Sequence, residues 1–136
     1  MNKRKISKTK WAFNKERNIY VLENLGPHGK RLYQETLSAV DTESWASVII
    51  LSATLIDVLA NEYNGPIKSV DGIILNKAFS NKNILWLRNK RNSIIHYEGP
   101  VEGMMGGAVQ TEILALDAKR SFEILINTVQ ILFKNF

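Results

Sequence analysis

The chain has 136 residues, of which 45% are hydrophobic and 23% are charged, the balance of a single globular domain with a core of its own. It contains no cysteine and only two histidines, which excludes a disulfide framework and a cysteine-ligated zinc site, so neither a metal nor another cofactor is expected. The formal charge is +5 at pH 7, and the lack of cysteine suits a cytoplasmic protein.

The positive charge is concentrated in two segments. Residues 1–10 contain five bases and no acid, and the other 13 bases of the chain are matched by 13 acids. Residues 72–97 also contain five bases and no acid. Such a segment attracts an RNA backbone, or is simply a solvated helix face. We expect residues 1–10 to be a disordered basic arm, either touching nucleic acid or aiding solubility, and residues 11–136 to form one domain.

The first part of the domain is predicted to contain two helices. Residues 11–25 favour a helix, although their apolar positions lack a clean period. The run Gly-Pro-His-Gly at 26–29 predicts a turn, in which His28 is an exposed loop residue rather than a catalyst. Residues 30–40 carry an apolar stripe at helical spacing and predict a short helix.

The most apolar segment is predicted to be a long helix over residues 43–63, with cap candidates at 41–44. Its apolar run covers about 16 residues, is interrupted by Ser47, Ser52, Thr54 and Asp57, and is shorter than the roughly 20 that a membrane span needs, so no membrane is expected. A helix that is apolar on nearly every face is the centre of a bundle, or is buried between a core and a dimer partner. Asp57 lies within it, where an unpaired carboxylate is costly.

The second half is predicted to be helical as well. Residues 70–79 favour a short helix or an irregular segment, and Ser80 or Asn81 is expected to cap the helix that follows, which ends before Gly99 and Pro100. The glycine-rich residues 101–107 predict a mobile loop, acting as a lid or as a plain connector.

The last helix is predicted to begin at Asp117, as its N-cap, and to continue to residue 133. Residues 109–116 are ambiguous between strand and helix. The fold class is therefore all-α: an up-and-down bundle of four main helices plus short helices.

The predicted helix that ends at His96 carries the residues best suited to chemistry. His96 is expected in its last turn, preceded by the bases Arg88, Lys90 and Arg91. Asn92 and His96, four residues apart, share one face, and Arg88 lies one turn earlier on it. Arg91 and His96 are about 140° apart around the axis and roughly 7.5 Å along it. They converge only if the last turn loosens, or if a second copy of the chain supplies the facing half.

The run from Arg91 through Asn92 to His96 resembles the motif of the HEPN superfamily, an arginine, a polar residue that is usually asparagine, and a histidine after four to six residues. HEPN domains are all-helical bundles, and many are metal-independent endoribonucleases of toxin–antitoxin, abortive-infection and CRISPR-associated systems. The resemblance covers roughly residues 42–136.

The resemblance implies a homodimer with a composite active site that cleaves RNA to a cyclic phosphate. Arg91 and His96 would be the catalytic pair, stabilising phosphate charge and moving protons. Asn92, Arg88 and Asp57 would support them. Asp57 would match the acidic residue that many members carry on the corresponding helix; otherwise it is a carboxylate that reaches water or caps a neighbour.

Three further side chains near the motif are expected to bind RNA. They are Lys82, Lys90 and Tyr97. An antitoxin protein is a further expected partner. In HEPN toxins paired with a nucleotidyltransferase antitoxin, a tyrosine lies two residues after the histidine; here Glu98 holds that position, which puts such regulation in doubt.

Two other functions stay open from the residues alone. The first is a catalytically inactive HEPN module that binds RNA, a nucleotide or a partner protein. The second is a purely structural bundle in which Arg91 and His96 cap the end of a helix.

Overall fold

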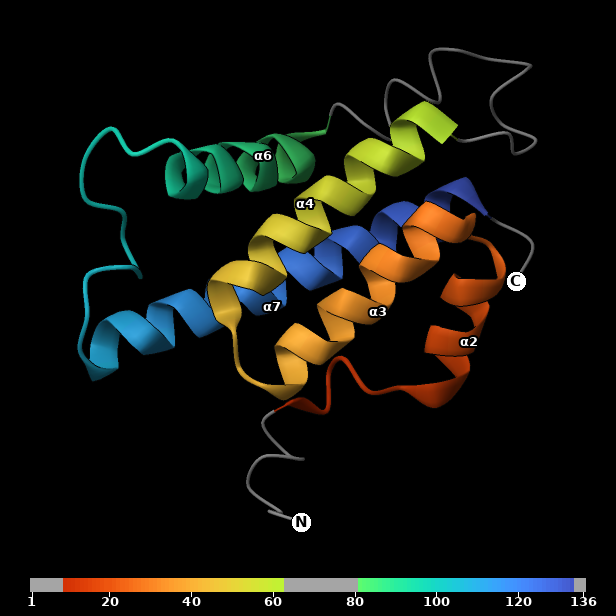
Figure 1. The fold of residues 1–136 in the computed structure, drawn as a ribbon, viewed down its shortest axis with the longest axis horizontal. Coiled ribbons are helices and arrows are strands. Elements are labelled where there is room, and N and C mark those ends of the chain that lie inside the picture. Colours follow the sequence, from red (N-terminus) through yellow and green to blue (C-terminus); the bar gives the residue numbers. More distant parts are fainter. Residues whose placement is uncertain (1–8, 63–80, 134–136) are drawn as a thin grey trace.

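The computed structural model describes residues 9–62 and 81–133, and within them the chain forms five α-helices and no strand (Figure 1). Their bounds are α2 Lys15–Glu23, α3 Pro27–Asp41, α4 Trp45–Glu62, α6 Lys82–Ile95 and α7 Ala108–Leu132. The prediction of an all-α bundle is confirmed. The segment predicted at residues 70–79, Ser80 as a cap and most of the N-terminal arm lie outside the described residues.

Helix α4 is the centre of the bundle. It packs against α3, α6 and α7, and it runs between α3 and α6 in Figure 1. Eight of its side chains are buried: Trp45, Val48, Ile49, Ser52, Ala53, Leu55, Ile56 and Leu59. Burying a large apolar side chain contributes about 1.5–3 kcal/mol, so this helix supplies much of the stability. Its 18 residues have a mean hydropathy of 1.4, enough by length and composition alone for a membrane span, as core helices often have.

An aromatic cluster ties the start of the described chain to the core. The ring of Trp11 lies 6.3 Å from that of Trp45 and 5.5 Å from that of Phe122, measured between centroids. Thr9 is buried, and its carbonyl accepts a hydrogen bond from the Ala12 N–H at 3.0 Å. The last residues of the predicted basic arm therefore belong to the folded domain.

Two helix starts show how cap chemistry operates in this chain. Asn81 caps α6, its side chain accepting from the Ile84 N–H at 2.9 Å, as predicted. The run at 26–29, in contrast, is not a free turn. Gly26 is the N-cap of α3 and Pro27 is its first residue, so His28 and Gly29 lie inside the first helical turn. Proline suits this position because its missing N–H has no intrahelical partner there.

Helix α7 is longer than predicted. It is continuous from Ala108 to Leu132, so the ambiguous segment is helical and Asp117 lies inside the helix instead of capping it. The N-cap is Gly107, whose φ of 90° favours glycine. The first turns of α7 extend past the end of α4 in Figure 1, and Val109 and Leu116 there are 72% and 65% exposed.

Candidate functional site

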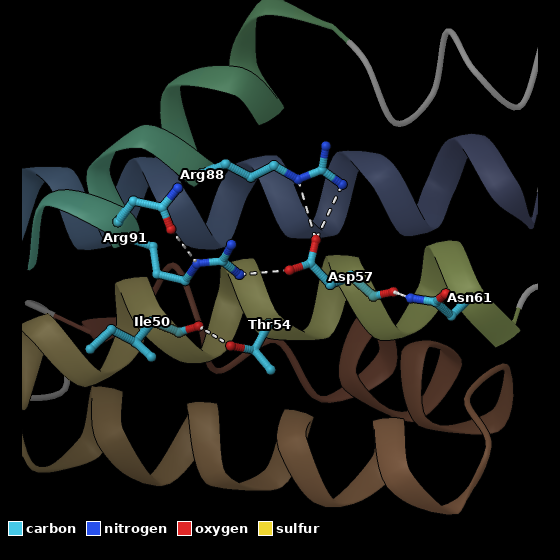
Figure 2. A network of polar contacts seen from close by, with 7 residues as sticks. Ile50, Thr54, Asp57, Asn61, Arg88 and Arg91 are labelled. Atoms are coloured by element: carbon cyan, nitrogen blue, oxygen red, sulfur yellow. Dashed lines mark hydrogen bonds and ion pairs between the residues drawn. The ribbon is translucent and has the colours of Figure 1, made fainter. Parts of the chain in front are cut away.

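A carboxylate on α4 joins two arginines of α6 (Figure 2). Arg91 Nη1 donates to Asp57 Oδ2 at 2.6 Å, and Arg88 Nε donates to Asp57 Oδ1 at 3.2 Å. Arg88 Nη2 lies at the same 3.2 Å from Oδ1. Arginines three residues apart lie on neighbouring positions of one helix face, so a single aspartate can bind both.

This cluster explains how a carboxylate is tolerated in the apolar helix α4. Charge-assisted hydrogen bonds to both oxygens replace the water that burial removes. The side chain of Arg91 is only 17% exposed, whereas those of Asp57 and Arg88 are 36% and 35% exposed. Of the two roles left open for Asp57, its contacts match the orientation of Arg91.

Lys90, which lies between Arg88 and Arg91 in the sequence, also has an acidic partner. Lys90 Nζ lies 2.9 Å from Asp117 Oδ2 on α7 and donates to the Glu102 carbonyl at 2.7 Å. Its side chain is 12% exposed. The expected role of Lys90 in holding RNA does not fit this geometry, since its ammonium already has two partners and little access to solvent. Asp57 and Asp117 thus offset two of the three positive charges on this part of α6.

The end of α6 departs from the predicted stop. The helix ends at Ile95, and His96 is its C-cap residue with extended backbone angles (φ −117°, ψ 91°). The His96 N–H still donates to the Asn92 carbonyl at 2.9 Å, so the final turn is regular. Gly99, three residues further on, does not form the cap. Loosening of the last turn, one of the two ways in which Arg91 and His96 could converge, is therefore absent, and His96 is exposed to solvent.

An open hollow of about 620 Å³ lies beside this helix end. Its lining includes His96 and Asn92, which confirms that these residues share a face, together with Asn89, Ser93 and the loop residues 98–101. Neither Arg88 nor Arg91 is among the described residues that line it. One chain therefore places its histidine and amides in the hollow and its arginines against α4.

The remaining predicted RNA ligands lie in different places. Lys82 is the first residue of α6, about 20 Å along the helix from His96 at 1.5 Å per residue. Tyr97 follows the histidine directly and is 78% exposed. Only Tyr97 is thus close to the hollow, where it lines a second, neighbouring depression.

Several residues of the site were missed from the sequence. Asn89 and Ser93 precede His96 by seven and three residues, a helical spacing that would have revealed them. Glu98 lines the same hollow, where its carboxylate repels a phosphate. No sequence spacing indicated the role of Asp117, because its contact with Lys90 depends on how α6 packs against α7.

Within residues 9–62 and 81–133, no group of three or more histidine, aspartate or glutamate side chains is arranged to hold a metal ion. Comparison with known proteins adds no assignment: no protein family, no curated protein and no solved structure matches this chain.

Proposed function

We propose that the protein is a metal-independent endoribonuclease that cleaves RNA to a cyclic phosphate end. The observation that carries the proposal is the open hollow at the end of α6, in which the exposed His96 lies with Asn89 and Asn92. Histidine is the commonest general acid or base in proteins, and amide groups can hold a phosphate or a ribose hydroxyl. The hollow is open enough to admit a polymer from the side.

The chemistry uses the substrate's own nucleophile. The ribose 2′-oxygen attacks the adjacent phosphorus while an imidazole takes its proton. The bond from phosphorus to the 5′-oxygen breaks, and that oxygen takes a proton from a second, protonated imidazole or from water, which yields a 2′,3′-cyclic phosphate. The guanidinium of Arg91 stabilises the charge on the phosphate oxygens. Asp57 holds that guanidinium in one orientation.

The arrangement of Arg91 and His96 supports a homodimer. Within one chain Arg91 binds Asp57 and does not line the hollow that contains His96, although its Nε donates to Asn92 Oδ1, at the edge of that hollow, at 3.4 Å. We propose that Arg91 of one copy faces His96 of another, so that each site is composite. The exposed apolar side chains of Val109 and Leu116 offer surface that a second copy can cover.

A cytoplasmic toxin–antitoxin or phage-defence system is the setting that we propose. An antitoxin protein would act by covering the hollow. This setting follows from the proposed activity, because an unregulated ribonuclease would damage the RNA of its own cell.

A second candidate is a catalytically inactive module that binds RNA, a nucleotide or a partner protein. The observation in its favour is that Asp57 already binds both Arg88 and Arg91. A guanidinium that keeps its carboxylate partner contributes less to a transition state than a free one. This function predicts binding without cleavage, weakened by substitution of His96.

The deciding experiment compares His96→Ala with His28→Ala, because both histidines are exposed and neither contributes to the core. We expect wild type and His28→Ala to cleave single-stranded RNA to cyclic phosphate ends. His96→Ala should be slower by a factor of about 10² to 10⁴ while remaining folded. Cleavage should survive excess EDTA, since imidazole and guanidinium take the roles that a metal would have. A purified wild type that leaves a broad panel of RNAs intact would refute the enzymatic proposal.

A further inference from the structure

A second hollow, of about 330 Å³, lies between the end of α6 and the loop that leads to α7. Its walls are mainly apolar and are formed by Ile94, Tyr97, Pro100, Val101, Met104 and Met105. Ser93 also lines it, and its hydroxyl donates to the Asn89 carbonyl at 2.9 Å. Tyr97, Met104 and Met105 are 78%, 45% and 50% exposed, so solvent now covers apolar surface that a ligand could bury.

The two hollows are neighbours. Ser93, Pro100 and Val101 line both of them. A ligand that occupies the apolar hollow therefore extends directly into the polar hollow that contains His96. The two hollows offer apolar side chains on one side of Ser93, and the His96 imidazole with the amides of Asn89 and Asn92 on the other.

The loop that carries the two methionines is held in place. Gln110 Oε1 accepts from the Gly103 N–H at 2.6 Å and from the Met105 N–H at 3.4 Å. Lys90 binds the Glu102 carbonyl at 2.7 Å. Contacts from both α6 and α7 thus fix the loop backbone, so the hollow is a formed feature of the fold instead of a chance gap in a free connector.

We propose that this apolar hollow binds a nucleobase, and that it thereby places the adjoining phosphate at His96. Every base has a flat π-face, which stacks on an aromatic ring, and the thioether sulfurs of methionine are polarisable and adapt to such a face. The volume is at the lower end of the roughly 300–1,000 Å³ of small-molecule sites, which suits one base and not a peptide helix. The inference rests on the proposed RNA substrate, gives Tyr97 a base-stacking role, and adds Met104 and Met105 as residues that orient the substrate.

The methionines make the proposal directly testable. The chain has three, at positions 1, 104 and 105, so labelling of the methionine methyl groups with ¹³C gives two NMR signals inside the hollow. The probe is a hexamer of 2′-O-methyladenosine, which cannot be cleaved because its 2′-oxygen is blocked. We expect the Met104 and Met105 signals to shift and saturate with this hexamer, and to remain unchanged with an abasic oligomer of equal length.

Variants of Tyr97 provide the matched comparison. Tyr97→Ala removes the ring and should weaken binding of the hexamer roughly tenfold or more, whereas Tyr97→Phe keeps the ring and should stay within about twofold of wild type. Equal affinities for Tyr97→Ala and wild type would overturn the proposal. Methionine signals that do not shift with the hexamer, or that shift equally with the abasic oligomer, would also overturn it. The hollow would then be a site for the side chain of a protein partner.

These outcomes are independent of the ribonuclease test. If wild type cleaves RNA but the methionine signals do not respond, the base-binding inference is wrong and the ribonuclease proposal stands. If the signals respond and no RNA is cleaved, the hollow binds bases in a protein that is not a nuclease.

Discussion

Arg91 of α6 and Asp57 of α4 form the shortest charged contact between helices in the described chain, with Nη1 and Oδ2 2.6 Å apart. The contact spans 34 residues of sequence and fastens the helix that carries His96 to the centre of the bundle. Asp57 also binds Arg88, so one carboxylate restrains two positions of α6. The site and the stability of the fold therefore share this residue.

We expect Asp57→Asn to destabilise the protein. An amide of the same shape keeps one acceptor oxygen but removes the negative charge that Asp57 presents to the guanidinium groups of Arg88 and Arg91. The three side chains are partly exposed, so solvent screening limits the loss to about 1 kcal/mol of unfolding free energy. Urea unfolding followed by circular dichroism measures it.

A double-mutant cycle with Arg91→Gln is the control. If the pair interacts as the structure shows, the two substitutions together should cost less than their sum, by about 0.5 kcal/mol or more. Arg31→Gln, whose side chain is 77% exposed, should change the unfolding free energy little. Strict additivity between positions 57 and 91 would contradict the contact.

Lys82 and Lys90, which the sequence predicts as RNA ligands, should differ in their effect on stability. Lys90→Gln leaves Asp117 and the Glu102 carbonyl without their partner, and should cost about 1–2 kcal/mol of unfolding free energy. Lys82→Gln removes an exposed charge at the start of α6 and should stay within about 0.5 kcal/mol of wild type.

RNA binding by the same pair of variants separates their roles. If Lys82 contacts a phosphate, Lys82→Gln should reduce the slope of log K against log salt by about 0.7 to 0.9. Lys90→Gln should leave the slope unchanged, because its ammonium is held by Asp117. A reduced slope for Lys90→Gln in a fully folded protein would show that this lysine releases its partners to bind RNA.

Stability at alkaline pH should depend on Tyr33, which is fully buried and donates to Asn18 Oδ1 at 2.6 Å. Burial raises the pKa of Tyr33 from the usual 10.0 of a tyrosine to about 12, against a smaller lowering effect of the nearby Arg17. The folded state therefore holds this proton more tightly than the unfolded state. Its stabilising effect is complete below pH 10 and is lost as the pH rises towards 12.

Urea unfolding between pH 8 and pH 12 measures this loss in wild type, Tyr33→Phe and Tyr97→Phe. The fall for wild type should be at most roughly 2–3 kcal/mol and should be reduced in Tyr33→Phe. Tyr97→Phe removes an exposed hydroxyl and is the control for one tyrosine fewer. Identical profiles for all three proteins would mean that Tyr33 is not protected from ionisation.

Local patterns predicted what depends on local physics. The apolar spacing of residues 30–40 and the all-round apolarity of 45–60 were sufficient for α3 and for the central α4, because burial follows such patterns directly. Asn81 is also predictable as a cap, because a cap depends only on the side chain at the helix start. Gly26 and Pro27 were misjudged because the pair suits both a turn and a helix start, and the residues that follow decide between them.

The partners of the charged residues could not be predicted, because they depend on how helices pack. Asp57 was singled out as costly, yet only the packing of α4 against α6 shows that two arginines bind it. Asp117 was assigned to a cap by a local rule, whereas its actual partner, Lys90, is 27 positions earlier on another helix. Helix α6 therefore presents less positive charge than its composition indicates.

The last prediction tests whether the site is composite. Arg91 and His96 are about 140° apart around α6, and Arg91 faces α4 while His96 lines the open hollow. If each site takes its arginine from one copy and its histidine from the other, a mixed dimer of Arg91→Ala and His96→Ala chains retains one intact site. Two inactive proteins, denatured together in equal amounts and refolded, should then recover roughly a quarter of wild-type ribonuclease activity, because half of the dimers are mixed and each has one of two sites. If both residues act within one chain, every chain in the mixture lacks a catalytic group and the mixture stays inactive.

Refolded wild type gives the reference activity, and the double variant Arg91→Ala/His96→Ala mixed with wild type shows whether an intact chain needs its partner. A mixture no more active than its components, while refolded wild type is active, would refute the composite site.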